Sequence, residues 1–230
     1  MKRSEINFYL RHAEDFFREH RFQLPPWAFW SADLWRSHWE ECREIRENAL
    51  GWDLTDFGGG DFERCGLLLF TIRNGNHAQS QRYPKPYAEK IMIVREGQVT
   101  PMHYHWKKME DIVNRGGGEL LIELHRADEE DGLSEEELEV QTDGITRRLP
   151  AGSVVRLQPG ESISLTPRLF HEFWGEEGKG AVLVGEVSMV NDDANDNNFY
   201  EARGRFPEID EDEPMLYPLC TDYERLAQAS

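Results

Sequence analysis

Two histidines and a glutamate stand close together near the middle of the chain. His103 and His105 are separated by one residue, and Glu110 follows shortly afterwards. If this stretch is a β-strand, its side chains alternate between two faces, so both imidazoles point one way and Tyr104 points the other. A turn after His105 would let the Glu110 carboxylate return to the same face from the next strand. Two imidazoles and a carboxylate on one face form a good partial site for a divalent transition metal.

Such a site needs at least one more ligand, and His171 is the candidate from later in the chain. The complete set would be three neutral nitrogens and one anionic oxygen, which can hold Mn, Fe, Co, Ni or Zn in the divalent state. Availability rather than affinity decides which of these ions is resident. A five- or six-coordinate ion would keep open positions for two adjacent oxygens of a hydroxy-aldehyde or hydroxy-ketone.

The spacing of these residues and of nearby glycines resembles the two sequence motifs of the cupin superfamily. The first motif is matched by Gly97, His103, His105, Glu110 and Gly117, and the second by Gly160, Pro167 and His171. Two histidines alone would more often be surface residues on a strand, but the additional matches favour a metal site. The resemblance implies an all-β cupin barrel, that is, a double-stranded β-helix or jelly roll.

Short apolar runs separated by turn residues dominate the chain after residue 50. Residues 65–72, 90–94, 119–124 and 181–188 have the length and composition of strands, and glycine- or proline-containing turns lie between such runs. Many short strands at this spacing are typical of an all-β barrel or sandwich. The strand pattern therefore agrees with the cupin resemblance.

The first part of the chain has a helical pattern instead. Ile6, Leu10, Ala13 and Phe17 recur at helical spacing within residues 5–20. We expect Ser4 to cap this helix, and Ser31 to cap a second helical stretch.

The chain length suits one domain built from these two parts. The sequence predicts a helical extension over residues 1–50, packed on a cupin barrel with a C-terminal loop and tail over residues 51–230. The acidic and proline-bearing tail, residues 207–218, is expected to wrap the barrel or a neighbouring subunit.

The composition excludes some classes of partner. The formal net charge is −18, from 44 acidic and 26 basic residues, which argues against binding to nucleic acid or to an anionic membrane. A small neutral or cationic ligand remains compatible with this charge. Three widely spaced cysteines, Cys42, Cys65 and Cys220, indicate a reducing compartment. With no apolar signal-peptide core and no run long enough to span a bilayer, we expect a cytoplasmic location.

An aldose–ketose isomerisation must remove a proton beside the carbonyl and stabilise a cis-enediol. A bound metal supplies the stabilisation as a Lewis acid, and a base must lie within hydrogen-bond reach of the proton. Lys90 and Glu201 are candidates for this base. Without further information, however, each would be interpreted as a solvated surface residue. Glu186 stands among apolar neighbours in a predicted strand, so it must be paired or lie in a cavity.

Longer segments are similar to the bacterial D-lyxose isomerases, which are cupin sugar isomerases. The similar segments are residues 51–60, 87–94, 105–118 and 184–193. The resemblance spans most of the chain. It implies a manganese-dependent and usually dimeric enzyme that interconverts D-lyxose with D-xylulose, and D-mannose with D-fructose.

The same resemblance implies roles for particular residues. The metal would be held by His103, His105, Glu110 and His171. A lysine at the Lys90 position and a loop glutamate would assist proton transfer, and our match for the glutamate is Glu201, with Glu208 and Glu211 close by. The predicted contacts to the sugar are Lys108, Glu186 and Arg205.

Two other functions stay open on the sequence. One is a cupin dioxygenase, in which the metal binds oxygen for an oxidation, and the other is a cupin that binds a sugar without converting it. A redox-inert metal would separate an isomerase from the first, and ketose formation would separate it from the second. The sequence does not rank D-lyxose against D-mannose, and it does not fix the resident metal or the oligomeric state.

Overall fold

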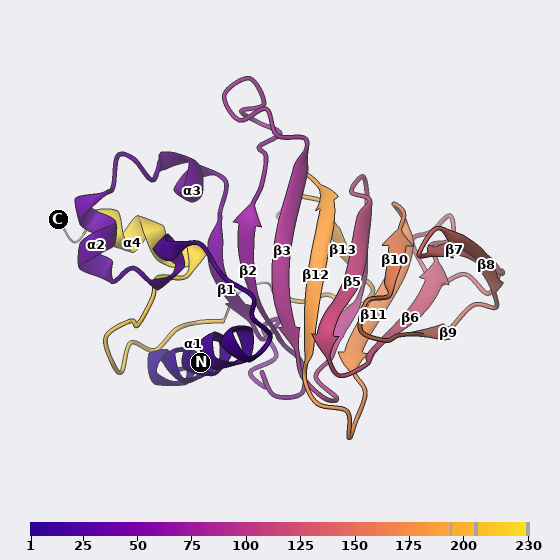
Figure 1. Ribbon diagram of the computed structural model, residues 1–230. Helices are drawn as coiled ribbons and strands as arrows, with labels where there is room; N and C mark the ends of the chain where they lie inside the picture. Colours follow the sequence, from indigo (N-terminus) through magenta and orange to yellow (C-terminus); the bar gives the residue numbers. More distant parts are fainter. Residues whose placement is uncertain (194, 205–206, 229–230) are drawn as a thin grey trace.

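The structure is a computed structural model that describes residues 1–193, 195–204 and 207–228. It contains two antiparallel sheets, with helices gathered beside one edge of the larger sheet (Figure 1). The larger sheet contains, in spatial order, β1 (Gly51–Thr55), β2 (Leu67–Arg73), β3 (Tyr87–Val94), β12 (Val182–Met189), β5 (Glu110–Gly117), β10 (Ser162–Leu165), β7 (Leu138–Thr142) and β8 (Ile145–Leu149). The smaller sheet contains β13 (Asn197–Phe199), β4 (Thr100–His105), β11 (Leu169–Gly175), β6 (Leu120–Arg126) and β9 (Ser153–Leu157).

The main core lies between the two sheets. Successive side chains of a strand point to opposite faces, so alternate residues of the facing strands meet in a single apolar layer. This arrangement confirms the prediction of a mainly β protein whose strands enclose an interior. Members of the layer include Leu69, Met92, Val94, Ile112, Leu120, Ile122, Leu124, Phe173 and Val184.

Helices lie beside the β1 edge of the larger sheet, and the first of them covers part of its outer face. They are α1 (Arg3–Glu19), η1 (Pro26–Phe29), α2 (Ala32–Ser37), α3 (Arg43–Glu47), η2 (Cys220–Asp222) and α4 (Tyr223–Gln228). The predicted apolar stripe of α1 packs on the strand residues that point away from the main core, such as Trp52, Phe70 and Ile91. Of the helices that the structure describes, none combines the length and apolarity needed to cross a membrane.

The predicted cap of α1 is wrong. The helix begins at Arg3, and the backbone N–H of Lys2 donates to the Glu5 carboxylate at 2.7 Å. Ser4 lies within the first turn, and its hydroxyl donates to Asp212 at 2.7 Å. The N-terminus of α1 is thus fixed by a partner from the other end of the chain, which local sequence patterns do not show.

The predicted cap of α2 is confirmed. The Ser31 hydroxyl accepts from the backbone N–H of Leu34 at 3.4 Å, and the backbone of Ser31 is extended, as is usual for a residue that caps a helix N-terminus.

Steric constraints explain why glycine occupies two positions of the first cupin-like motif. Gly117 has a φ of +82°, and a Cβ there would lie 2.3 Å from the Ala181 carbonyl oxygen on the neighbouring strand connection. Gly97 has a φ of +64° in the turn between β3 and β4. Side chains disfavour this left-handed region, so both glycines let the strands that carry the histidines and the glutamate turn sharply.

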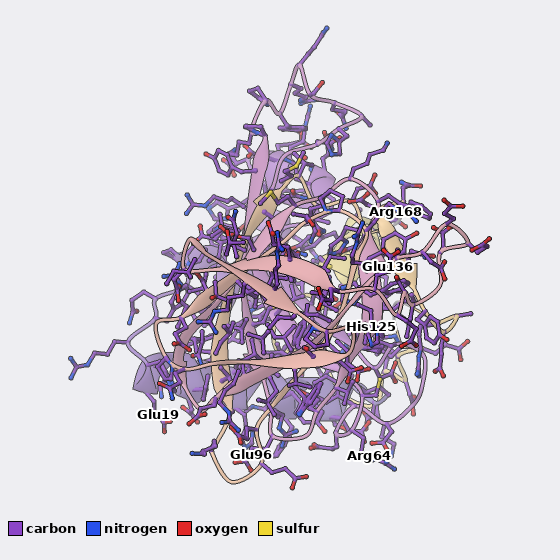
Figure 2. The ribbon with its side chains drawn as sticks, turned by 90° about the vertical axis from the view of Figure 1, so that its right-hand side faces the viewer. Glu19, Arg64, Glu96, His125, Glu136 and Arg168 are labelled. Atoms are coloured by element: carbon purple, nitrogen blue, oxygen red, sulfur yellow. The ribbon has the colours of Figure 1, made fainter. Side chains whose placement is uncertain are left out.

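Charged side chains cover the outside of the molecule. Glu19, Arg64 and Glu96 lie toward one edge, whereas His125, Glu136 and Arg168 lie on another part of the surface (Figure 2). Glu19, Arg64, Glu96 and Glu136 are exposed to solvent. The acidic excess of the sequence is therefore carried in part by solvated side chains, as is usual for such groups.

The C-terminal segment runs along α1 and is tied to it by buried charges. Arg3 is fully buried, and its guanidinium donates to Asp222 at 2.7 Å and to Glu211 at 2.7 Å. Asn7 also donates to the Glu213 carboxylate at 2.6 Å. The tail predicted to wrap the barrel packs, in this chain, across the helix that covers the barrel.

Replacing Arg3 with alanine should destabilise the fold strongly, because the buried Asp222 carboxylate would lose its cation. We expect the free energy of unfolding to fall by about 3–5 kcal/mol, measured by urea denaturation. Arg18→Ala is the matched control, since Arg18 forms an exposed pair with Asp15, and it should change stability by no more than about 0.5 kcal/mol. Equal effects of the two substitutions would contradict this account of the Arg3 contacts.

Candidate active site

The predicted site residues come from both sheets at one end of the molecule. In the larger sheet, Lys90 in the first half of β3 is the register neighbour of Glu186 in the second half of β12, and Glu110 opens β5. This end of the sheet is uppermost in Figure 1, where β12 finishes and β3 and β5 begin. In the smaller sheet, His103 on β4 lies opposite His171 on β11. The two sheets therefore present these side chains to one shared interior.

Three imidazoles and one carboxylate converge there, and we call His103, His105, Glu110 and His171 the His–Glu cluster. One ring nitrogen from each histidine lies within 4.8 Å of the others. Oε1 of Glu110 lies 3.3 Å from Nε2 of His105 and 3.2 Å from Nε2 of His171. All four residues are buried, and the most exposed is His103 at 8 %. The predicted turn after His105 does return Glu110 to the face of the histidines.

Backbone contacts orient two of the rings. Nδ1 of His103 lies 2.7 Å from the Pro101 carbonyl oxygen, and Nδ1 of His171 lies 3.0 Å from the Leu169 carbonyl oxygen. A carbonyl oxygen only accepts, so each Nδ1 carries the proton and each Nε2 keeps a lone pair.

The lone pair of His171 Nε2 points at no donor. This atom is buried and makes no hydrogen bond with any part of the chain that the structure describes. Its near neighbour is Oε1 of Glu110 at 3.2 Å, which as an ionised carboxylate oxygen also only accepts. Two buried acceptors facing each other need an explanation, and a cation bound between them provides one.

The donor atoms fit a divalent cation in spacing as well as in kind. Ligands bound at about 2.1 Å in tetrahedral or octahedral geometry lie roughly 3.0–3.4 Å from their neighbours. The separations of 3.2 and 3.3 Å between Glu110 and the two imidazoles fall within this range. The three imidazoles can therefore hold a metal ion, and the Glu110 carboxylate lies beside two of them.

The protonation states also suit metal binding. Burial, followed by the nearby His171 and His105 rings, lowers the pKa of His103 well below its usual value. Burial and the Lys108 ammonium lower the pKa of His105. Burial alone would raise the pKa of Glu110, but Lys108 and His105 outweigh it and hold that pKa well below its usual range. Neutral imidazoles and an ionised carboxylate are the forms that coordinate a metal.

Two lysines lie beside the cluster and share one carboxylate. Nζ of Lys108 lies 2.7 Å from Glu110 Oε2 and 3.0 Å from Glu186 Oε1, while Nζ of Lys90 lies 3.3 Å from Glu186 Oε2. Burial lowers the pKa of Lys108, but the charges of Glu110 and Glu186 outweigh it and raise that pKa. Burial raises the pKa of Glu186, but Lys108 and Lys90 outweigh it and lower that pKa. Glu186, predicted to be paired or in a cavity, is both.

The structure places the other predicted residues away from this group. Glu201 is exposed and pairs with Arg203 at 2.7 Å. Glu211 pairs with Arg3, as described above, and the Glu208 carbonyl oxygen accepts from the N-terminal amino group of Met1. Glu186, rather than a glutamate of the C-terminal loop, is thus the carboxylate that accompanies Lys90 in the interior. Arg205, a predicted sugar contact, lies outside the described residues.

Sequence reasoning assigned no role to the loop that covers this interior. Both oxygens of Asp196 accept from backbone N–H groups, of Lys107 at 2.9 Å and of Lys108 at 3.0 Å. Phe199 on β13 packs beside His103, with ring centroids 5.3 Å apart. The signal was the run of asparagine and aspartate in residues 190–198, which disfavours regular structure and suits an ordered functional loop or a cap on a sheet edge, but does not show what the loop contacts.

A narrow hollow of about 60 Å³ surrounds the cluster, and we call it the inner hollow. Its lining includes three of the His–Glu cluster side chains together with Lys90, Lys108 and Glu186. The arrangement combines a place for a cation with an ammonium and a carboxylate that can exchange a proton. These are the requirements of a metal-assisted proton transfer.

Comparison with known proteins agrees with this chemistry. The family described as D-lyxose isomerase matches residues 1–223. The chain belongs to the D-lyxose isomerase family. It is 52 % identical to the D-lyxose/D-mannose isomerase of Serratia proteamaculans, over 98 % of this chain and 99 % of the relative. It is 50 % identical to the protein of the same name from Escherichia coli O157:H7, again over 98 % and 99 % of the two chains.

Solved structures support the fold of this family member. It resembles a mutant L-ribose isomerase of Acinetobacter sp. DL28 in complex with L-ribose, with a TM-score of 0.60 and 16 % identity over 91 % of this chain and 98 % of that one. The L-ribose isomerase of Cellulomonas parahominis with L-ribose gives a TM-score of 0.57 at 17 % identity, over the same shares. The predicted cupin barrel with an N-terminal helical extension is confirmed. Its family and its relatives at about half identity make the protein a sugar isomerase.

Removing one imidazole should abolish metal retention. His171→Ala deletes a buried imidazole of the cluster, and we expect the affinity for a divalent ion to fall at least about 100-fold, measured by calorimetry and by the metal content of the purified protein. The control is His125→Ala on the neighbouring strand β6, whose ring lies beside Glu123 and which should retain metal. Full metal content in His171→Ala would rule out this ligand set.

Proposed function

We propose that the protein is a metal-dependent aldose–ketose isomerase that interconverts D-lyxose with D-xylulose and D-mannose with D-fructose. The observation that carries the proposal is the joint presence, in one hollow, of three His–Glu cluster side chains and the Lys90–Glu186 pair. The names of the two relatives at about half identity support the choice of sugars. A cupin that only binds a sugar has no need of a buried acid–base pair beside the bound sugar.

We propose His103, His105, Glu110 and His171 as the metal ligands, and Mn²⁺ as the ion, with Co²⁺, Fe²⁺, Ni²⁺ or Zn²⁺ as substitutes. When bound, the ion supplies Lewis-acid stabilisation of the negative charge that develops on the sugar oxygens. The chain contributes the orientation of the ligands. Lys108 holds Glu110 by a contact of 2.7 Å, so the carboxylate keeps one oxygen toward the imidazoles and the other toward the ammonium.

Proton transfer falls to Lys90 and Glu186 in this proposal. Their side chains are each 6 % exposed and lie 3.3 Å apart, on adjacent strands at the same level. Conversion of an aldose to a ketose moves one proton from carbon 2 to carbon 1 and another from the oxygen on carbon 2 to the oxygen on carbon 1. One group of the pair can take and return the carbon-bound proton, while the other relays the proton between the two oxygens. Burial excludes bulk water, which would otherwise exchange with the proton or protonate the enediol at the wrong carbon.

Lys108 has a different role because the N–H groups of its ammonium already have hydrogen-bond acceptors. An ammonium has three N–H groups, and Nζ of Lys108 has acceptors in Glu110 at 2.7 Å, Glu186 at 3.0 Å and Asn191 at 3.3 Å. A hydrogen bond from Lys108 to a sugar hydroxyl would replace one of these contacts, most readily the longest. We therefore propose that Lys108 chiefly fixes the two carboxylates and can also contact the sugar.

The family resemblance further supports a homodimer and a cytoplasmic location, and we include both in the proposal. The acidic surface is consistent with a small uncharged partner such as a sugar. Sedimentation of the purified protein measures the oligomeric state directly, and a monomer at micromolar concentration would remove the dimer from the proposal.

Metal removal and replacement tests the reaction. We expect protein stripped by a chelator to form no ketose from D-lyxose or D-mannose, and Mn²⁺ to restore ketose formation, since the cluster requires a cation to stabilise the enediolate charge. Re-metallation with each divalent ion on a panel of pentoses and hexoses gives the metal and sugar preference. Ketose formation with redox-inert Zn²⁺ would exclude a dioxygenase. Sugar binding without ketose under every metal would leave a non-catalytic cupin.

Substitution of the proposed acid–base pair should remove turnover and spare the metal. We expect Lys90→Ala and Glu186→Gln each to lower kcat by about 10²–10⁴-fold, with the metal content of the wild type. Glu201→Gln separates the two glutamates: with an exposed side chain paired to Arg203, it should keep kcat within about twofold, a change typical of surface positions. A large loss in Glu201→Gln with wild-type kcat in Glu186→Gln would reverse the assignment.

A further inference from the structure

A second and wider hollow adjoins the inner one, and we call it the outer hollow. Its volume is about 610 Å³, against about 60 Å³ for the inner hollow. Asp193 lines both, and Thr71 in the outer hollow is the register neighbour of Lys90 in the inner one. The inner hollow has room for only a few water molecules. A pentose or hexose is several times larger, so a sugar whose carbons 1 and 2 react there must extend into adjoining space.

Asn191 stands at the junction of the two hollows. Its Oδ1 accepts from Nζ of Lys90 at 2.6 Å and from Nζ of Lys108 at 3.3 Å. An ammonium can only donate, so the amide atom that faces the lysines must be the oxygen. The planar amide then directs Nδ2 away from them. Asn191 lines the outer hollow, and its Nδ2 has no hydrogen-bond acceptor in the part of the chain that the structure describes.

The backbone of Asn191 is held in place by another asparagine. Its N–H donates to Oδ1 of Asn74 at 3.0 Å, and Nδ2 of Asn74 donates back to the Asn191 carbonyl oxygen at 3.0 Å. Asn48 in turn donates from Nδ2 to the Asn74 carbonyl oxygen at 3.2 Å. Asn74 and Asn48 are buried. These reciprocal contacts fix where the Asn191 amide stands, so its Nδ2 donor has a defined direction.

We propose that Nδ2 of Asn191 binds a hydroxyl group at carbon 4 or 5 of the open-chain sugar, while Oδ1 holds Lys90 beside the reacting carbons. This inference rests on the proposed isomerase function and adds a residue that reads the far part of the substrate. Carbon 3 is bonded to a reacting carbon and stays at the inner hollow, so the groups that can reach the outer hollow are the later ones.

The arrangement would couple recognition of the sugar to catalysis. A hydroxyl oxygen that accepts from Nδ2 restrains the same rigid amide whose oxygen positions Lys90. The binding energy of a group remote from the reacting carbons then helps to hold Lys90 in position. In this way a remote contact raises kcat as well as affinity. An aldose that lacks this hydroxyl would leave the donor unpaired and lose both effects.

The test is a double-mutant type of cycle, in which the Asn191 side chain and a hydroxyl group of the sugar are removed separately and together. We measure kcat and KM of the manganese-loaded wild type and of Asn191→Ala with D-lyxose, with D-lyxose lacking its 4-hydroxyl and with D-lyxose lacking its 5-hydroxyl. In the wild type, one of the two deoxy sugars should lower kcat/KM by about 5- to 10-fold, the loss expected for one hydrogen bond. In Asn191→Ala, D-lyxose itself should lose at least as much, and that deoxy sugar should lose less than about twofold further.

Two controls separate the outcomes. Asn198→Ala alters the same residue type on β13, where Asn198 lies opposite Tyr104, and it should keep the wild-type penalty for the deoxy sugar. Metal content and thermal midpoint show whether Asn191→Ala is folded and loaded. If neither deoxy sugar is penalised by the wild type, or if Asn191→Ala keeps the full penalty, the assignment is wrong.

Failure of the proposed function would look different. In that case the wild type would form no ketose from any sugar, whatever its metal. Calorimetry with the alditol of D-lyxose, which cannot react, still tests the subsite: its Kd should rise about 5- to 10-fold in Asn191→Ala. An unchanged Kd would overturn the role of Nδ2 independently of turnover.

Discussion

The contact of Lys108 with Glu110 and Glu186 is the interaction on which the site depends. Two carboxylates buried in one hollow repel each other, and each would tend to take up a proton unless a cation lay between them. The Lys108 ammonium, 2.7 and 3.0 Å from the two side chains, keeps both ionised. Glu110 is thereby available to a metal and Glu186 to a proton. Without this lysine the same residues would have different charges and different chemistry.

The second constraint is that the proposed ligands come from two sheets. His103 and His171 face each other across β4 and β11, whereas Glu110 and Glu186 belong to β5 and β12 of the larger sheet. The distances within the cluster therefore depend on how the sheets pack, which the apolar layer between them fixes. Interiors of this kind are close-packed and deform little. The core thus fixes the spacing of the side chains that we propose as metal ligands.

The loop after β12 completes the site from outside the barrel. Asp196 binds the backbone that precedes Glu110, Asn191 binds the two lysines, and Phe199 packs on His103. One segment thus contacts the His–Glu cluster, the proposed acid–base pair and the outer hollow.

The His–Glu cluster and the fold class could be predicted from the residues alone, because both follow largely from short-range rules and motif spacing. Alternation along a strand places His103 and His105 on one face, a turn returns Glu110 to it, and Gly117 marks a position that only a residue without a side chain can fill. The apolar stripe of α1 follows in the same way from helical spacing.

Which charged groups meet depends on the three-dimensional fold. Glu186 and Lys90 are far apart in the sequence, and their contact arises from the pairing of β12 with β3. Glu201 stands in an equally suggestive stretch but lies at the surface with Arg203, and Ser4 is held by Asp212 from the other end of the chain. Pairing over such separations depends on strand order and on sheet packing, and neither is encoded in the local spacing of residues.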